Sequence, residues 1–298
     1  MTENEFILQD RMAKIKSIDE QYNLLGKGYL SFSGGKDSTV LHKLLDLALP
    51  GNEIPRVFID TGIEYKNIVD FVKKYENKDK RIVSLKPSRN IRELLEIYGY
   101  PFKSKEYAQR LSSWKVGNRA DYLIKWANGT KFASCPKKLR YQLSDDFKLK
   151  ISDKCCLKLK KEPVHEWSKL NGRPIAITGM RQEEGGNRKT LHCITSKNNK
   201  VVKFHPLSVV SEEWENWFIE EYKIELCSLY SKPYNFTRTG CKGCPFALDL
   251  QRNLDILQKF FPSERKQCEI IWKPVYDEYR RIGYRLEKED EFKLFDLF

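Results

Sequence analysis

The chain of 298 residues lacks long apolar runs, and no uninterrupted stretch approaches the roughly 20 residues of a membrane-spanning helix. Its first residues, MTENEFILQDRMAKIKS, are charged throughout and lack the apolar region of a signal peptide. Low-complexity linkers and internal repeats are also missing, while hydrophobic residues make up 40% of the chain. We therefore expect a globular protein of the cytoplasm that has no membrane partner.

A reducing compartment disfavours disulfides, so the eight cysteines are expected to be free thiols or metal ligands. Two pairs favour ligands, because Cys155 and Cys156 are adjacent and Cys241 and Cys244 form a CxxC. Four thiolates can hold a [4Fe–4S] cluster. Tetrahedral zinc is the alternative, although two adjacent cysteines are awkward ligands for one zinc ion.

Charge of one sign dominates the middle of the chain. The net charge is +13, and residues 103–161 contain 16 Lys and Arg against five Asp and Glu, a net charge of +11. The aromatic residues interleaved there are Tyr107, Trp114, Tyr122, Trp126, Phe132, Tyr141 and Phe147. Basic side chains with aromatics suit a nucleic acid such as tRNA or DNA. A solvated surface over core aromatics, or a funnel for a small anionic nucleotide, is the alternative.

Short apolar stretches alternate with segments of helical periodicity. The expected strands are 29–33, 56–60, 81–85 and 174–178, and the expected helices are 5–25, 39–49, 65–75 and 91–98. This order predicts parallel βαβ units and a doubly wound sheet. The basic segment 103–161 interrupts the alternation as an insertion. We expect an α/β domain over 1–210 and a mainly helical region, carrying the CxxC, over 211–298.

A Walker A loop is absent, because that motif needs GxxxxGK before Ser or Thr and here Gly35-Lys36 precedes Asp37. What remains is Ser-Gly-Gly-Lys-Asp-Ser at 33–38, between an expected strand and an expected helix. Its glycines allow close backbone approach, its serines offer hydroxyls, and the helix N-terminus supplies N–H groups and a favourable dipole. The stretch predicts a phosphate or pyrophosphate cradle; a plain Gly-Gly turn is the alternative.

Several stretches together resemble the phosphoadenosine phosphosulfate (PAPS) reductase family, a branch of the PP-loop ATP pyrophosphatases. They are SGGKDS (33–38), VFIDTGIEY (57–65), ITGMRQEEGGNRK (177–189), HPLSVVSEEWENW (205–217) and RTGCKGCPF (238–246). The resemblance covers most of the chain. It implies a three-layer α/β/α sandwich with a mostly parallel sheet, of the adenine nucleotide alpha-hydrolase-like type.

The resemblance also implies roles for individual residues. Those expected to hold the phosphates are Ser33, Gly34, Gly35, Lys36, Asp37 and Ser38, with catalysis assigned to Lys36, Asp37 and Ser38. Those expected in the same crevice, past the carboxyl ends of strands, are Asp60, Thr61, Gly62, Gly179, Arg181 and Arg188. The four paired cysteines resemble the ligand set of the cluster-bearing adenylyl sulfate reductases.

One motif of the family is missing. Assimilatory sulfonucleotide reductases carry a nucleophilic cysteine in a Glu-Cys-Gly motif near the C-terminus, and the ending YRRIGYRLEKEDEFKLFDLF has none. Reduction through a cysteine S-sulfonate is therefore disfavoured. The loop SGGKDS is instead the version expected of members that split ATP between its α and β phosphates.

We therefore expect an enzyme that binds ATP with Mg²⁺, releases pyrophosphate and activates an acceptor for sulfur transfer. The acceptor would be tRNA, DNA or a small molecule, and the sulfur would come from a donor protein or sulfide. Two alternatives stay open. One is a phosphoadenylyl or adenylyl sulfate reductase, and the other is a nucleotide-dependent nucleic-acid-binding protein without turnover.

Overall fold

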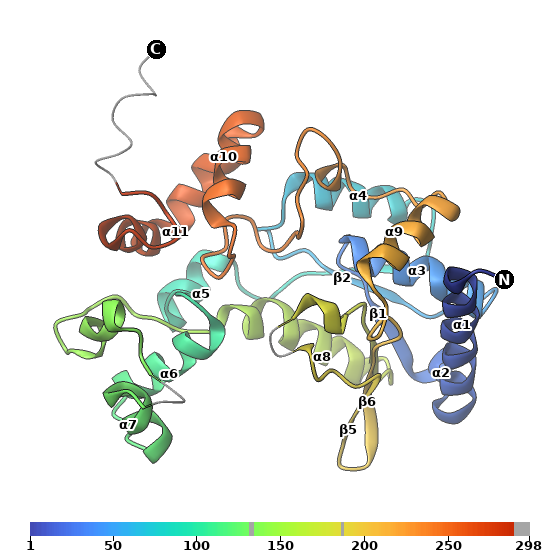
Figure 1. Cartoon of the computed structure of the whole chain (residues 1–298), viewed down its shortest axis with the longest axis horizontal. Coiled ribbons are helices and arrows are strands. Elements are labelled where there is room, and N and C mark those ends of the chain that lie inside the picture. Colours follow the sequence, from blue (N-terminus) through green and yellow to red (C-terminus); the bar gives the residue numbers. More distant parts are fainter. Residues whose placement is uncertain (131–133, 186–187, 289–298) are drawn as a thin grey trace. The chain divides into compact units, whose positions relative to one another are not determined.

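The computed structural model describes residues 1–130, 134–185 and 188–288. The chain groups into two compact units (Figure 1). Unit 1 contains residues 1–60, 64–86 and 162–239, and unit 2 contains residues 61–63, 87–161 and 240–298. This division differs from the expected boundary near residue 211, because the basic insertion and the CxxC belong to the same unit.

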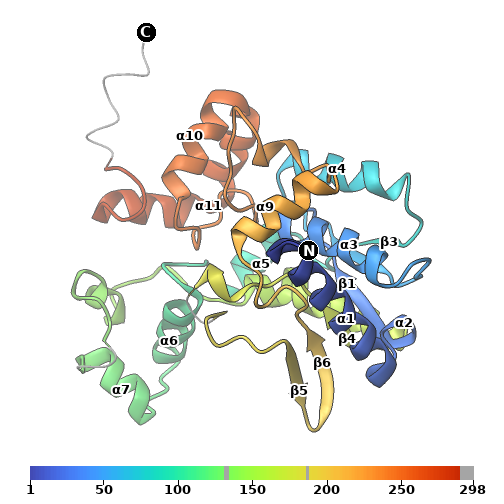
Figure 2. The ribbon, with the colours of Figure 1, turned by 45° about the vertical axis from the view of Figure 1, so that its right-hand side comes forward.

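Unit 1 is built on a six-stranded sheet with the strand order β3-β2-β1-β4-β6-β5 (Figure 2). The strands are Gly28–Ser31 (β1), Arg56–Ile59 (β2), Ile82–Leu85 (β3), Ile175–Ile177 (β4), Ile194–Lys197 (β5) and Lys200–Phe204 (β6). Neighbouring strands are parallel except for the antiparallel pair β5 and β6. The expected α/β class with a mostly parallel sheet is confirmed.

Helices cover both faces of this sheet. Those of unit 1 are Glu3–Tyr22 (α1), Leu24–Lys27 (α2), Lys36–Ala48 (α3), Lys66–Glu76 (α4), Glu162–Leu170 (α8) and Glu212–Glu221 (α9). On one face, Tyr29 of β1 packs edge-on against Trp167 of α8, with ring centroids 5.7 Å apart. On the other face, Phe32 contacts His42 of α3 and Tyr75 of α4. These contacts build the three-layer arrangement.

The hairpin of β5 and β6 was not predicted from the sequence. Asn198 and Asn199 form its turn with φ of 50° and 58°, the left-handed conformation that two-residue hairpin turns require. Figure 1 shows the hairpin extending beyond the other strands of unit 1. Its residues are largely exposed, so they lack the apolar alternation by which a half-buried strand is recognised.

Buried charges tie together the amino ends of β2 and β3. Arg56 is fully buried, and its Nη2 lies 2.6 Å from Oδ1 of Asp46 on α3. Arg81, before β3, binds the same carboxylate oxygen at 2.8 Å and Asp79 at 2.8 Å. Arg56 Nε also donates to Nδ1 of His42 at 3.2 Å, which requires an unprotonated Nδ1. This network lies at the sheet edge opposite the carboxyl ends of the strands.

His42 gives unit 1 a measurable pH dependence. Burial, together with the nearby Arg56 guanidinium, lowers the pKa of His42 to about 4, against about 6.5 in an unfolded chain. As the pH falls from about 6.5 to about 4, the unfolded chain binds a proton that the folded protein does not. The resulting loss in the free energy of unfolding is about 1.4 kcal/mol per pH unit. Urea unfolding of His42→Asn should therefore show a pH slope smaller by that amount than the wild type.

The exposed His165 on α8 provides the control. His165→Asn is expected to keep the wild-type slope in the same measurement. If His42→Asn also kept the wild-type slope, His42 would be charged in the folded protein and the assigned hydrogen bond from Arg56 would be wrong.

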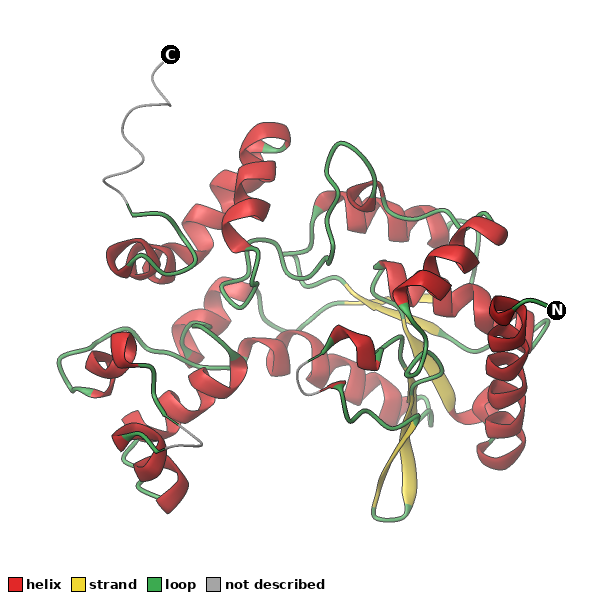
Figure 3. Cartoon of the chain, viewed as in Figure 1, coloured by secondary structure: helices red, strands yellow, loops and turns green. Residues whose placement is uncertain are grey.

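Unit 2 is built from helices and loops (Figure 3). Its helices are Ile91–Tyr98 (α5), Lys105–Lys115 (α6), Asp121–Asn128 (α7), Leu250–Phe260 (α10) and Pro262–Ile282 (α11), with short turns at Lys137–Leu143 (η1) and Leu157–Lys161 (η2). The Tyr279 hydroxyl of α11 accepts from the Lys103 N–H at 2.8 Å and donates to the Pro245 carbonyl at 2.9 Å. This buried hydroxyl joins the insertion to the C-terminal segment. No described helix has the length and apolar character needed to cross a membrane.

Candidate functional site

The loop 33–38 joins β1 to α3 at the carboxyl edge of the parallel strands. Gly34 has φ +69°, and a Cβ there would lie 2.8 Å from Cγ2 of Val72 on α4, so a side chain would be both strained and crowded. Gly35 is the N-cap of α3 and makes no side-chain capping bond. The loop thus presents backbone at a helix N-terminus, the position that favours an anion.

Ser38 maintains the shape of the loop. Its hydroxyl accepts from the Ser33 N–H at 3.2 Å and donates to the Gly35 carbonyl at 3.0 Å. The Ser33 and Ser38 hydroxyls lie 3.1 Å apart. Ser38 is buried whereas Ser33 is exposed. Of the two predicted hydroxyls, Ser33 is therefore the one at the surface of the loop.

Lys36, the first residue of α3, reaches two carboxylates of α9. Its Nζ lies 3.0 Å from Oε1 of Glu212 and 3.3 Å from Oε2 of Glu215. Burial opposes the charge on Lys36, but the Glu215 and Glu212 carboxylates outweigh it and raise the pKa of the ammonium. Lys36 therefore stays positively charged beside the loop.

Arg181, in the loop after β4, brings a second cation to the same place. Its guanidinium is largely buried, with Nη2 at 3.3 Å from Oε2 of Glu215 and Nε at 3.6 Å from Oδ1 of Asp37. Nη1 lies 2.9 Å from the exposed carboxylate of Glu183. The structure thus brings together three residues predicted for the site, Lys36, Asp37 and Arg181.

Gly179 allows the loop after β4 to approach the start of α3. A Cβ at Gly179 would lie 2.9 Å from the backbone oxygen and 3.0 Å from the carbonyl carbon of Asp37. Backbone atoms cannot move aside as the end of a flexible side chain can, so the approach requires glycine here. This contact explains why Gly179 belongs with the loop 33–38.

Two hydroxyl groups from the segment after α9 also lie at the loop. Tyr230 and Thr239 are hydrogen-bonded to each other at 2.6 Å, and a Cβ on Gly35 would lie 3.1 Å from the Tyr230 oxygen. The Tyr230 hydroxyl also interacts with the backbone N–H of Lys36. Thr239 lies in the stretch RTGCKGCPF, which carries part of the resemblance, but neither residue was assigned a role.

The other residues predicted for the crevice are Asp60, Thr61, Gly62 and Arg188. Asp60 follows β2 at the same edge of the sheet and its N–H donates to Leu85 at 2.8 Å. Thr61 and Gly62 belong to unit 2, where the Thr61 hydroxyl accepts from the Ile63 N–H at 3.4 Å. Arg188 is half-buried in the long loop after β4. The role of Arg188 at the site stays a prediction.

All four paired cysteines belong to unit 2. Cys155 interacts electrostatically with Cys156, Cys244 and Cys241. Within the described ranges, however, no three His, Cys, Asp or Glu side chains are arranged so that they could hold a metal ion. Four thiols are chemically suited to an iron–sulfur cluster, but the metal-ligand assignment stays a prediction.

The surroundings favour a thiolate at Cys156, one of the four paired cysteines. The hydrogen bond from Cys155 lowers the pKa of Cys156, and Lys105, Lys160 and Lys161 act in the same direction, although burial opposes them. Burial raises the pKa of the Cys244 thiol to about 12. A bound metal ion would offset the cost of burying the Cys244 thiolate, because thiols that bind a metal are deprotonated.

The aromatic residues of the basic segment divide into two groups. Tyr107 and Trp126 are buried and contact each other, with ring centroids 5.6 Å apart, so they are core residues. Tyr122 and Tyr141 are exposed. Trp114 is covered by the Arg119 guanidinium, 3.9 Å from the ring centroid. Phe132 lies outside the described residues. The interpretation that these aromatics serve base stacking is therefore wrong for the two buried ones.

Comparison with known families identifies the class of protein. Residues 27–247 match the phosphoadenosine phosphosulfate reductase domain. The chain therefore belongs to this family, and the resemblance drawn from its motifs is confirmed.

Its relatives include two proteins of Methanocaldococcus jannaschii. The uncharacterized protein MJ0973 is 27% identical over 281 residues, covering 87% of this chain and 56% of that protein. The uncharacterized protein MJ0066 is 26% identical over 258 residues, covering 84% of this chain and 41% of that protein. The chain thus spans about half the length of these relatives.

Solved structures with a similar chain trace include two enzymes. Phosphoadenylyl-sulfate reductase from Candida auris has 16% identity and a TM-score of 0.42, covering 72% of this chain and 81% of that one. The U34-tRNA thiolase NcsA from Methanococcus maripaludis, solved with its [4Fe-4S] cluster, has 16% identity and a TM-score of 0.38, covering 98% of this chain and 84% of that one.

Sequence reasoning missed the carboxylates that hold the two cations. Glu212 and Glu215 lie in the stretch HPLSVVSEEWENW, which carries part of the resemblance, but neither was assigned a role. The available signal was local: the Ser211 hydroxyl caps α9 by accepting from the Trp214 N–H at 3.1 Å, and three Glu occupy the first turn. That pattern is typical of any helix start and does not point to a site.

Proposed function

We propose that this protein is an ATP pyrophosphatase that adenylates an acceptor, for which a nucleic acid is the best candidate, and then replaces the activated oxygen with sulfur. The observation that carries the proposal is the meeting of Lys36 and Arg181 at the N-terminus of α3. Two cations beside a helix N-terminus suit a dianionic phosphate group or pyrophosphate. Family membership supports a phosphate-bearing adenine nucleotide as the ligand.

In the first step, the β and γ phosphates of ATP lie on residues 33–38. An acceptor oxygen attacks the α-phosphorus, the bond to the oxygen bridging the α and β phosphates breaks, and pyrophosphate leaves. Lys36 and the backbone N–H groups of the loop stabilise the negative charge that builds on the leaving group. Asp37 would hold the Mg²⁺ that neutralises part of the phosphate charge when bound.

In the second step, sulfide attacks the carbon that carries the adenylated oxygen. The carbon–oxygen bond breaks, and AMP leaves with that oxygen. Cys155, Cys156, Cys241 and Cys244 would hold a [4Fe–4S] cluster, which would order this part of unit 2 as structural metal sites do. Zinc on the same thiols is the alternative.

The surface of unit 2 supports an anionic macromolecule as the acceptor. Residues 103–161 carry a net charge of +11, and Tyr122 is exposed there. Lysine and arginine side chains bind phosphates, and exposed aromatic rings can stack on unpaired bases. A transfer RNA, which has unpaired loops, uses both features, whereas duplex DNA uses mainly the charge.

The test measures release of AMP and pyrophosphate from ATP by anaerobically purified protein, alone and with bulk transfer RNA or duplex DNA. We expect release to be stimulated by transfer RNA and lost in Asp37→Ala. Asp70→Ala, which removes an exposed carboxylate on α4, is the matched control and should retain release. No release under any condition would contradict the proposal and favour a sulfonucleotide reductase or a nucleotide-dependent binding protein.

A further inference from the structure

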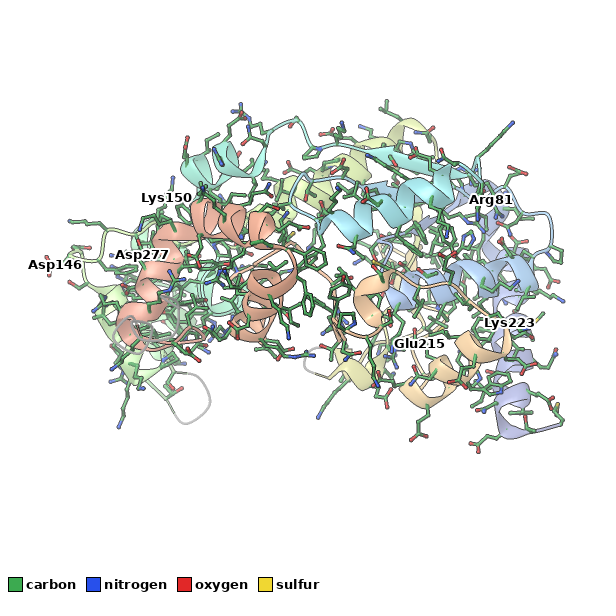
Figure 4. The ribbon with its side chains drawn as sticks, turned by 90° about the horizontal axis from the view of Figure 1, so that it is seen from above. Arg81, Asp146, Lys150, Glu215, Lys223 and Asp277 are labelled. Atoms are coloured by element: carbon green, nitrogen blue, oxygen red, sulfur yellow. The ribbon has the colours of Figure 1, made fainter. Side chains whose placement is uncertain are left out.

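Glu215 is a buried carboxylate to which the proposed chemistry gives no part. It is fully buried on α9, and Figure 4 shows its position on that helix. Neither of its oxygens has a hydrogen-bond partner of ordinary geometry among the described residues. Instead a single oxygen, Oε2, lies 3.3 Å from Lys36 Nζ and 3.3 Å from Arg181 Nη2. One carboxylate oxygen therefore bridges both cations of the candidate nucleotide site.

Burying the Glu215 carboxylate lowers the stability of the fold unless its interactions compensate for the lost hydration. A buried carboxylate must give up its hydration, and ion pairs recover that cost only with good geometry and further hydrogen bonds. Burial and the nearby Asp37 charge raise the pKa of Glu215, although Arg181 and Lys36 oppose them. A hydrophobic side chain would fill the same space without this penalty. The position therefore keeps an ionisable carboxyl group for a reason other than packing.

The two cations come from different segments, which follow the carboxyl ends of the paired strands β1 and β4. Lys36 begins α3 and Arg181 follows β4. Each side chain places a nitrogen 3.3 Å from Oε2 of Glu215. Because both nitrogens lie 3.3 Å from one oxygen, the distance between Lys36 Nζ and Arg181 Nη2 is at most twice 3.3 Å. Neighbouring phosphate groups of a pyrophosphate present oxygens at a similar spacing, so both cations can reach one polyphosphate chain.

We propose that Glu215 is a positioning residue that holds Lys36 and Arg181 at the spacing of two adjacent phosphate groups. The inference rests on the proposed function, since it assumes that the site binds the polyphosphate of ATP. Glu212 has a different role in this arrangement: it is exposed, its carboxylate pairs with Lys36, and it is the carboxylate that an incoming phosphate displaces. Glu215 keeps both cations aligned while that exchange takes place.

The experiment measures binding of inorganic pyrophosphate and of ATP with Mg²⁺ to the full chain by isothermal titration calorimetry. Glu215→Gln keeps the size of the side chain and removes its charge, and we expect about 10- to 100-fold weaker binding. Glu212→Gln should bind pyrophosphate more tightly than the wild type, because it removes the carboxylate that the phosphate must displace from Lys36. Glu213→Gln, an exposed neighbour on α9, controls for the loss of one negative charge.

A double-mutant cycle separates positioning from a merely structural role. If Glu215 acts through Lys36, Glu215→Gln should weaken binding much less in a Lys36→Met background than in the wild type. A structural defect would instead weaken binding equally in both backgrounds, and the inference would be overturned. Glu215→Asp, which keeps the charge but shortens the side chain, should bind with intermediate affinity.

Two failures are distinguishable. If the wild type binds neither ligand, the proposed function fails; if it binds and Glu215→Gln binds within about 2-fold of it, only the role of Glu215 fails. Should the Glu215 variants not fold, melting temperatures of Lys36→Met, Arg181→Met and the double variant give the answer without ligand. Cations that share one buried oxygen should show non-additive shifts, and additive shifts would overturn the inference.

Discussion

Lys36→Met is expected to lower the rate of pyrophosphate release from ATP by about 10²- to 10³-fold, the usual loss when one preorganised donor to a developing negative charge is removed. Lys36 is the cation nearest the N-terminus of α3, and the Glu215 and Glu212 carboxylates raise the pKa of its ammonium against the effect of burial. Methionine keeps most of the length of the side chain but cannot stabilise the leaving pyrophosphate. The measurement is single-turnover release of pyrophosphate under saturating ATP.

Saturating ATP separates the chemical step from binding, because a loss that remains under saturation belongs to the transition state. Lys43→Met is the matched control. Lys43 lies on the same helix, with its Nζ 5.8 Å from the centre of the Tyr222 ring, and the variant should release pyrophosphate at the wild-type rate. If Lys36→Met released pyrophosphate at the wild-type rate, Lys36 would take no part in the chemical step and would act only in binding.

Cys241→Ser is expected to remove most of the bound iron and acid-labile sulfide from anaerobically purified protein. The wild type should hold about four irons per chain if its four paired cysteines ligate a [4Fe–4S] cluster. Serine is a poor substitute for a soft thiolate ligand. We expect the same loss for a serine at any of the other three positions, Cys155, Cys156 and Cys244, because a cluster held by four thiolates depends on each of them.

Cys193→Ser is the control for this prediction. Cys193 lies in unit 1, whereas the four paired cysteines all belong to unit 2. It should keep its iron. Stoichiometric zinc without labile sulfide in the wild type would identify the alternative metal. Protein that carries neither metal after anaerobic purification would contradict the metal-ligand assignment.

The sequence alone determined the alternation of the strands β1 to β4 with the helices α3, α4 and α5, and the family of the chain. The four predicted parallel strands are present, and α5 has the predicted bounds, Ile91–Tyr98. These features are local: apolar periodicity within a few residues defines an element, and Gly34 with Gly35 defines a turn that few other residues permit. The loop 33–38 was found for the same reason, because all its parts are adjacent in the sequence.

Only the tertiary structure decided which charged residues share a site. Lys36 and its partner Glu212 are 176 residues apart along the chain, and nothing in the sequence around either indicates the other. The same holds for the aromatic residues of the basic segment, where packing against neighbouring elements buries Tyr107 and leaves Tyr122 exposed. Composition describes which side chains are present but not which way each faces.

The division into units depended on tertiary contacts in the same way. The buried Tyr279 hydroxyl binds both Lys103 and Pro245 and thereby joins the insertion to the segment after residue 239. The physical reason is that hydrogen bonds and ion pairs between distant segments form only after the backbone has brought them together. A local pattern therefore predicts an element, whereas the partner of a buried charge is determined by the fold.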